Sequence, residues 1–135
     1  MEIRPARILL VEDNPGDVIL TRKSFERWNL VNDLDVVTTG EAAIERIEQT
    51  RPDIVLLDLN LPGISGFDVL RLARANSAVS HIPIVVLTSS SAEADIAKSY
   101  GYAANGYLVK PPTMKQLNNL VDVVVGHWFA HGRTP

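Results

Sequence analysis

Short, unbroken apolar runs alternate along this chain with longer stretches in which apolar residues recur at helical spacing. The runs are Ile8 to Val11, within a strand expected from Arg7 to Glu12, and then Ile54 to Leu57, Ile84 to Leu87 and Gly106 to Val109. A run of this length without polar alternation is typical of a strand that is buried on both faces, as in a parallel sheet. A fifth run, Leu34 to Thr38, is interrupted by Asp35, and we place it at an edge of the sheet.

The stretches between these strands carry the signals of helices. Five are expected, beginning at Asn14-Pro15, then Glu41 to about Gln49, Ser65 to about Asn76, Ser91 to Tyr100, and from Thr113 onward. Asn and Pro are favoured where a helix starts, and Asp17 follows in the first turn, where a carboxylate is favourable. The pairs Ser65 with Asp68, Ser90 with Glu93 and Thr113 with Gln116 match capping boxes.

Five strands alternating with five helices predict βαβ units and an α/β fold. Because parallel crossovers are right-handed, helices then cover both faces of one five-stranded parallel sheet, which is a doubly wound arrangement. The length of 135 residues suits a single domain, residues 1–135, without a linker long enough to divide it.

Charge and composition exclude several classes of function. Thirteen basic and 16 acidic residues give a formal charge of −3, so nothing in the charge favours binding to nucleic acid or to an anionic membrane. The chain has no cysteine, which excludes disulfides, thiolate metal sites and cysteine nucleophiles. Since no apolar stretch reaches 18 residues, we expect a soluble, cytoplasmic protein.

Polar groups stand at the ends of four of the strands. They are Glu12 with Asp13, Asp58, Thr88 and Lys110. Parallel strands bring their carboxyl ends to one edge of the sheet, where three carboxylates would repel one another and favour a hard cation such as Mg²⁺. A metal ion, an ammonium and a hydroxyl around one carboxylate make up a site for an oxyanion or phosphoryl group. Asp58, after the central strand, is the natural nucleophile because a carboxylate can form an acyl phosphate.

Four motifs carry a family resemblance: ILLVEDNP, DIVLLDLNLPGISG, IPIVVLTSS and GYLVKP. In this order and spacing, over about residues 7–129, the chain resembles a response regulator receiver domain of two-component signalling, of the stand-alone chemotaxis-regulator type. The resemblance implies the flavodoxin-like strand order 2-1-3-4-5. The amino-acid sequence of these motifs is also similar to that of stand-alone regulators that partner bacterial phytochromes.

The resemblance also implies roles for individual residues. Asp58 is the phosphoacceptor, and Mg²⁺ is held by Asp13 directly, by Glu12 through water, by Asp58 and by the Asn60 backbone carbonyl. Thr88 and Lys110 contact the phosphoryl oxygens. Thr88 and Tyr107 form the switch that alters the surface around the fourth helix, last strand and last helix. The Lys110–Pro111 peptide bond is expected to be cis, whereas general statistics favour trans.

The same resemblance implies the partners. The phosphoryl group is expected to come from a sensor histidine kinase or from a phosphotransfer protein. The similarity to regulators of bacterial phytochromes implies that the kinase is a phytochrome. The chain itself is then expected to be a phosphoacceptor rather than an enzyme with separate substrates. Because only six residues follow Phe129, we expect output through protein contact or phosphoryl relay. Val123 and Phe129 lie off the apolar stripe of the last helix, which comprises Leu117, Leu120, Val121, Val124 and Trp128. We expect this region to bind a partner or a second copy of the chain; the alternative is that these are scattered surface apolar residues, which are common.

Three other functions are alternatives for a chain with this pattern. A haloacid-dehalogenase-like phosphatase requires a second Asp two residues after the nucleophile, but Asn60 stands there. A flavodoxin-like cofactor binder requires a phosphate-binding loop after the first strand, where Glu12 and Asp13 would repel the phosphate. A receiver-like adaptor that acts without phosphorylation is the remaining alternative, and the intact site argues against it.

Overall fold

The computed structural model describes residues 6–28 and 33–127 and has the predicted α/β architecture. In chain order the elements are β1 (Arg7–Val11), α1 (Pro15–Glu26), β2 (Asp33–Val37), α2 (Gly40–Thr50), β3 (Ile54–Leu57), α3 (Gly66–Ala75), β4 (Ile84–Thr88), α4 (Glu93–Gly101), β5 (Gly106–Val109) and α5 (Met114–His127). All strand pairs are parallel and the order is β2-β1-β3-β4-β5, so the predicted order is confirmed.

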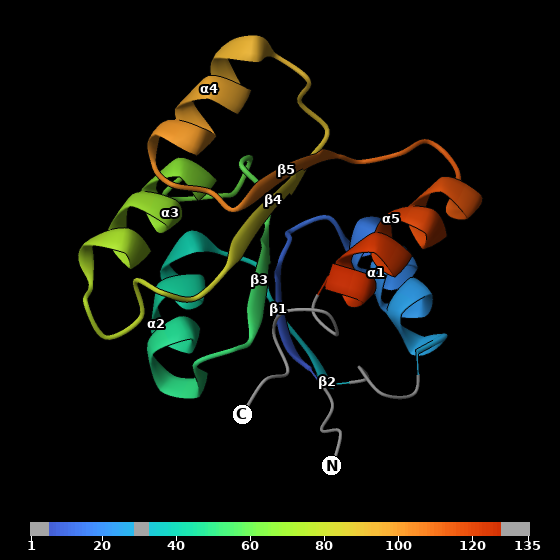
Figure 1. The fold of residues 1–135 in the computed structure, drawn as a ribbon, viewed down its shortest axis with the longest axis horizontal. Coiled ribbons are helices and arrows are strands. Elements are labelled where there is room, and N and C mark those ends of the chain that lie inside the picture. The colour runs from blue at the N-terminus through green and yellow to red at the C-terminus, as the bar shows by residue number, and fades with distance from the viewer. Residues whose placement is uncertain (1–5, 29–32, 128–135) are drawn as a thin grey trace.

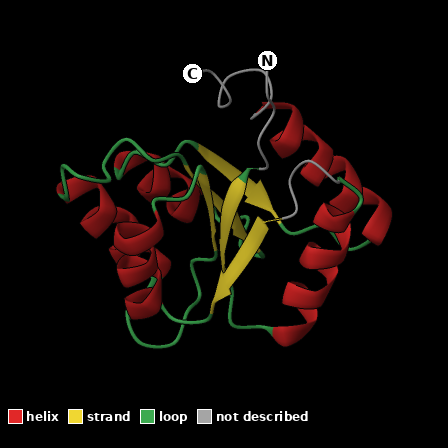
Figure 2. Ribbon diagram, turned by 90° about the horizontal axis from the view of Figure 1, so that it is seen from below, coloured by secondary structure: helices red, strands yellow, loops and turns green. Residues whose placement is uncertain are grey.

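The sheet lies between two layers of helices. Helices α1 and α5 pack together on one face, and α2, α3 and α4 cover the other, as Figures 1 and 2 show. Strand β1 shows why its sequence lacks alternation: Ile8 and Leu10 point toward α1 and α5, whereas Leu9 and Val11 point toward α2 and α3. Both faces of the strand are therefore buried, and both require apolar side chains.

Most of the predicted helix starts are confirmed. The Asn14 side chain accepts a hydrogen bond from the Asp17 N–H at 3.0 Å, and Ser65 and Asp68 form the reciprocal capping box of α3. The Thr113 hydroxyl accepts from the Gln116 N–H at 3.2 Å at the start of α5. These local bonds satisfy N–H groups that have no partner within the helix.

The capping box predicted for α4 is wrong. The helix begins at Glu93 after Ala92, whose side chain makes no capping bond. Ser90 therefore lies two residues too early to cap it, and its hydroxyl instead donates to Asp95 Oδ2 at 2.6 Å. The expected cis bond between Lys110 and Pro111 is also not found, since the described residues contain no cis peptide bond, in line with the general preference for trans.

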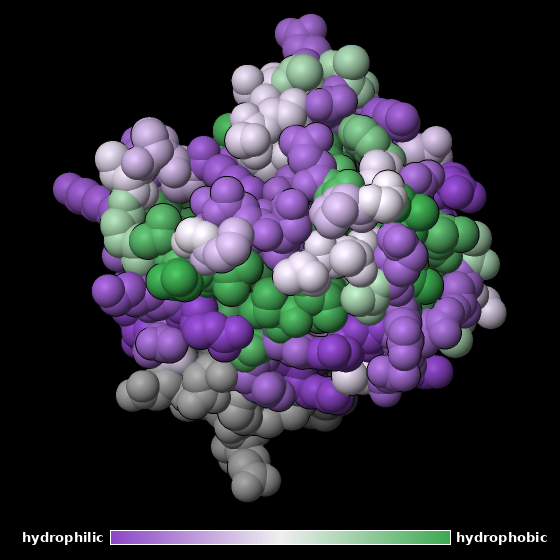
Figure 3. Space-filling model, turned by 180° about the vertical axis from the view of Figure 1, so that it is seen from behind, coloured by the Kyte–Doolittle hydropathy of each residue, from purple (hydrophilic) through white to green (hydrophobic). Residues whose placement is uncertain are grey.

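Helix α5 buries the stripe predicted for it as far as the structure describes it. Leu117, Val121 and Val124 are buried and Leu120 is partly buried, whereas Val123 is 68% exposed; Trp128 and Phe129 lie outside the described residues. Seen from behind, apolar residues gather in a band across the middle of an otherwise largely hydrophilic face (Figure 3). In the described part of the chain, no helix has the length and apolar character needed to cross a bilayer.

Candidate functional site

The carboxyl ends of four strands meet at one edge of the sheet and bring the predicted polar residues together. Glu12 and Asp13 follow β1, Asp58 follows β3, Thr88 ends β4 and Lys110 follows β5. Backbone hydrogen bonds extend beyond the strand ends, from the Asp58 N–H to the Val11 carbonyl at 3.0 Å and from the Lys110 N–H to the Thr88 carbonyl at 2.7 Å. These bonds fix the site residues to the rigid sheet.

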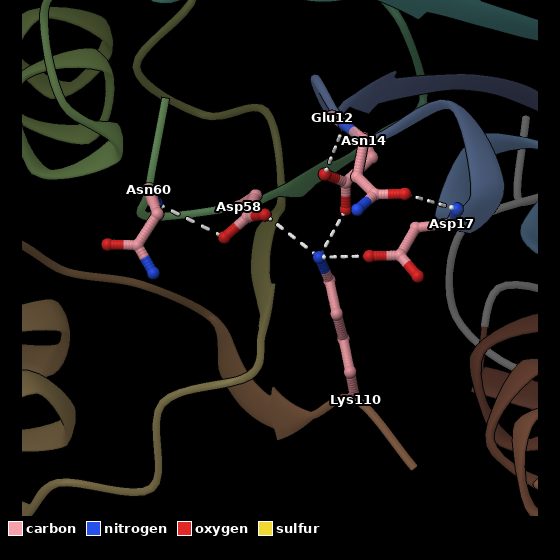
Figure 4. A network of polar contacts seen from close by, with 6 residues as sticks. All are labelled: Glu12, Asn14, Asp17, Asp58, Asn60 and Lys110. Carbon is pink, nitrogen blue, oxygen red and sulfur yellow. Dashed lines mark hydrogen bonds and ion pairs between the residues drawn. The ribbon is translucent and has the colours of Figure 1, made fainter. Parts of the chain in front are cut away.

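Lys110 lies at the centre of the site (Figure 4). Its ammonium contacts Glu12 Oε1 at 2.5 Å, Asp17 Oδ2 at 2.9 Å and Asp58 Oδ2 at 2.9 Å. Burial by itself would lower the pKa of Lys110, but the hydrogen bonds to these three carboxylates outweigh it and raise the pKa above its ordinary value. Lys110 is therefore a fixed positive charge beside Asp58 at any physiological pH.

Three carboxylates form a cluster next to this lysine. Each of Glu12, Asp13 and Asp58 offers an oxygen, and these atoms all lie within 4.8 Å of one another. Glu12 and Asp58 are buried and Asp13 is exposed. Burial raises the pKa of Glu12, and the hydrogen bonds from Lys110 and the Asn14 N–H lower it; the effect of burial is the larger one, so the pKa is raised overall. A cation at this cluster would relieve both the repulsion and the cost of burial.

The donors of this cluster fit a divalent metal ion. Only carboxylate oxygens converge, which suits a hard ion such as Mg²⁺ or Mn²⁺. The exposed Asp13 gives the cluster an open side toward solvent. Asn60 donates its N–H to Asp58 Oδ1 at 3.1 Å and so orients that carboxylate, while the predicted contact of its carbonyl with the metal stays a prediction.

Thr88 and Tyr107 lie beside the site on the neighbouring strands. Thr88 is fully buried, and its hydroxyl has no hydrogen-bond partner within the described structure. A buried hydroxyl without a partner is costly, so this atom is a donor that a ligand oxygen would satisfy. The Tyr107 hydroxyl donates to the Ser90 carbonyl at 2.8 Å and so connects β5 to the loop after Thr88.

Two residues at the site were not predicted as part of it. Asp17 was expected only as a charge at the start of α1, yet it contacts Lys110, which lies 93 positions away. Gly66 packs against the backbone of Asp58 and Leu59, where an added Cβ would lie 2.3 Å from the Asp58 carbonyl oxygen. The motif DIVLLDLNLPGISG contains Gly66, but only the folded chain shows what the glycine faces.

A mostly apolar hollow of about 140 Å³ adjoins the site between α1 and the start of α5. Asp17 and Lys110 line it together with Leu20, Thr21, Leu87, Pro111, Pro112, Thr113, Met114 and Leu117. The hollow therefore lies directly beside the Lys110 side chain.

Comparison with known proteins agrees with this geometry. The model of the family described as "Response regulator receiver domain" matches residues 8–122. The chain is 33% identical to the probable methanogenesis regulatory protein FilR2 of Methanothrix harundinacea, over 97% of this chain and 88% of that protein. It is 35% identical to the response regulator Rcp1 of Synechocystis sp., over 93% of this chain and 90% of that one.

Solved structures show the same similarity. The Mn²⁺-bound form of Rcp1 superposes with a TM-score of 0.87 at 34% identity, covering 97% of this chain and 99% of that one. The phosphorylated cyanobacterial phytochrome response regulator RcpA gives a TM-score of 0.87 at 32% identity, over 93% and 94% of the two chains. The chain therefore belongs to the response regulator receiver domain family and is a response regulator of two-component signalling.

Proposed function

We propose that Asp58 accepts a phosphoryl group from a phosphohistidine of a sensor histidine kinase, and that the reaction requires Mg²⁺. The observation that carries the proposal is the position of the Asp58 carboxylate, 2.9 Å from the Lys110 ammonium and within the cluster of carboxylate oxygens. The P–N bond to the kinase histidine breaks as an Asp58 oxygen forms the O–P bond of an acyl phosphate. The imidazole of the kinase is the leaving group.

The residues of the site contribute mainly by position and charge. The transition state of phosphoryl transfer is loose and in line, so catalysis consists of holding the groups and neutralising charge. Lys110 and the unpartnered Thr88 hydroxyl would bond to the phosphoryl oxygens. Asp13, Asp58, the Asn60 carbonyl and, through water, Glu12 would hold Mg²⁺. When bound, the ion supplies positive charge opposite the phosphoryl oxygens.

We further propose that phosphorylation moves Thr88 toward the new phosphoryl group and that Tyr107 then turns inward. The hydrogen bond from Tyr107 to the Ser90 carbonyl supports this coupling, because it ties the strand that carries Tyr107 to the loop that follows Thr88. The result is a change in the surface of α4, β5 and α5, driven by local charge. Equal solvent exposure of Tyr107 in the free protein and with a phosphoryl mimic bound would exclude the coupling.

The mass of the intact protein tests the phosphoacceptor. After incubation with acetyl phosphate and Mg²⁺, the wild type should gain the mass of one phosphoryl group, and Asp58→Asn or a chelator should prevent the gain. Asp33→Asn is a matched control, because Asp33 is exposed and begins β2 at the opposite edge of the sheet. A gain that persists in Asp58→Asn would assign the phosphoryl group elsewhere. No gain under any condition would favour the adaptor that acts without phosphorylation.

The partner in this proposal is a phytochrome-type sensor kinase, and the protein acts with it in the cytoplasm as a phosphoacceptor rather than as an enzyme with separate substrates. The similarity to RcpA, a phytochrome response regulator, supports this choice. The apolar hollow between α1 and α5 would contact the kinase beside its phosphohistidine. Transfer from an autophosphorylated phytochrome kinase should be faster than from a kinase of another sensor class, and equal rates would refute the preference.

We also propose that two copies of the chain pair through the α5 region. The exposure of Val123 supports this proposal, because this apolar side chain on α5 is 68% exposed and pairing would bury it. Phe129, which was expected to take part, lies outside the described residues. Sedimentation at several concentrations, with and without a phosphoryl mimic, measures the association. A protein that stays monomeric in both states would exclude the dimer.

A further inference from the structure

Asp17 differs from the other two carboxylates that bind Lys110. Glu12 and Asp58 belong to the cluster of oxygens that fits a divalent ion, whereas Asp17 does not. It projects from the first turn of α1, and its Oδ2 lies 2.9 Å from the Lys110 ammonium on the side away from Asp58 (Figure 4). The side chain of Asp17 is 38% exposed, so the contact lies at the border of the site.

Local bonds hold Asp17 in this position. The Asn14 N–H donates to Glu12 Oε2 at 3.1 Å, and the Asp17 N–H donates to Asn14 Oδ1 at 3.0 Å. Because Lys110 contacts both Asp17 and Glu12, these polar contacts form a closed ring of four residues: Glu12, Asn14, Asp17 and Lys110. The ring connects the loop after β1 and the start of α1 to the end of β5, so the position of the ammonium is defined by two elements besides its own strand.

An ammonium has three N–H donors, and in this structure all three contact carboxylates. The reaction proposed above would engage two of these partners, since Asp58 would carry the phosphoryl group and Glu12 would help to hold the ion through water. Asp17 is the partner that neither event involves. It can therefore hold Lys110 while the other two donors are redirected to the phosphoryl oxygens.

We propose that Asp17 is a positioning residue that keeps the Lys110 ammonium at the phosphoryl group after Glu12 and Asp58 have been engaged. The inference rests on the proposed function of Asp58. Asp17 contributes no atom to the reaction and acts only through Lys110. A simpler role is also open to it, because a carboxylate in the first turn stabilises a helix whatever its side chain contacts. The experiment must separate the two roles.

The test compares Asp17→Asn with Glu26→Gln, which removes an exposed carboxylate of the same charge from the other end of α1. With acetyl phosphate and Mg²⁺, Asp17→Asn should be phosphorylated about tenfold more slowly, because a displaced catalytic group loses rate steeply with distance. Glu26→Gln should match the wild type. Asp17→Glu, which keeps the carboxylate, should recover part of the rate.

Two further readouts separate positioning from helix stability. In a Lys110→Met background, adding Asp17→Asn should cause no further loss of rate. In NMR spectra of the lysine ammonium groups, with Mg²⁺ and beryllofluoride as the phosphoryl mimic, the Lys110 signal should be visible in the wild type and lost in Asp17→Asn through faster exchange with water. If Lys110→Met is too slow to follow, the NMR comparison decides.

An unchanged rate in Asp17→Asn, an equal loss of rate in the Lys110→Met background, or an unchanged Lys110 signal would each overturn the proposal. Failure of the proposed function gives a different pattern, because the wild type itself would then gain no phosphoryl group or would gain it in Asp58→Asn. The contact between Asp17 and Lys110 remains testable by NMR in the protein without metal in either case.

Discussion

A substitution at Gly66 tests whether the position of the backbone at Asp58 and Leu59 is essential for the proposed reaction. It is the first residue of α3, and its N–H donates to the Leu59 carbonyl at 2.9 Å. A Cβ added at Gly66 would lie 2.3 Å from the Asp58 carbonyl oxygen and 2.7 Å from Leu59 Cα. Both are backbone atoms, so no side chain can rotate away to make room for a methyl group.

The size of the effect follows from these distances. Ordinary contacts of a Cβ begin at 3.4 Å, so Gly66→Ala must move α3 or the loop by about 1 Å. Overpacking of this kind costs about 1–3 kcal/mol of unfolding free energy, which exceeds the gain of up to about 1 kcal/mol from replacing glycine in a helix. Because a displacement of about 1 Å can cost a hundredfold in rate, we expect phosphorylation of Asp58 to slow by ten- to a hundredfold.

The matched control is Gly126→Ala in α5, where an added Cβ meets nothing within 4 Å. That variant should gain about 0.5–1 kcal/mol in stability and keep the wild-type rate. Urea unfolding measures the first quantity, and the time course of mass gain with acetyl phosphate measures the second. If Gly66→Ala were as stable as Gly126→Ala and were phosphorylated at the wild-type rate, the close approach of α3 to Asp58 would not constrain the site.

Three other measurements probe the fold and the acidic cluster. The Arg74 guanidinium donates to the Ser80, Ile82 and Ala103 carbonyls and to Asn105 Oδ1, so Arg74→Met should lower the free energy of unfolding in urea by about 2–4 kcal/mol, and Arg74→Lys should lose about half of that. Equal stability of both variants and the wild type would refute this. Burial raises the pKa of Glu12 above 4.5, so without metal its contribution favours folding at low pH and is lost as the pH rises through the folded-state pKa. The stability of the wild type relative to Glu12→Gln, followed by urea unfolding at several pH values with a chelator, should therefore fall above pH 4.5, and a constant difference would contradict the argument. Mg²⁺ at a hundredfold excess over its Kd should stabilise the wild type by about 2.7 kcal/mol in thermal unfolding, and the same gain in Asp13→Asn would show that the ion binds elsewhere.

The sequence predicts the fold well because its signals are local. Strands buried on both faces leave unbroken apolar runs, and strand ends are marked by the polar residues that follow them. Since the sheet is parallel, knowing where each strand ends is enough to place Asp58, Thr88 and Lys110 together. The start of α4 was predicted less well, because Ser90, Ser91 and Ala92 all precede Glu93 and only the path of the loop decides which residue caps the helix.

The contact of Asp17 with Lys110 had no comparable local signal. Asp17 satisfies a local rule, as a carboxylate in the first turn of α1, and that rule accounts for it without any tertiary contact. Its side chain reaches Lys110 only because α1 packs against the edge of the sheet where β5 ends. Because the position of Asp17 at the start of a helix already explains the residue, the sequence gives no reason to expect its contact with Lys110, which depends on the tertiary structure.

In the proposed function, the charges of the site connect metal binding, phosphorylation and switching. Four carboxylates and one ammonium carry a formal charge of −3 when all are ionised. Phosphorylation replaces one carboxylate charge by about two on the phosphoryl group, so without a divalent ion the charge would reach about −4. An ion offsets this increase at the moment of transfer. In the proposed switch, the phosphoryl oxygens would give the buried Thr88 hydroxyl a hydrogen-bond partner, which it lacks in this structure, and this new bond would draw Thr88 toward Asp58.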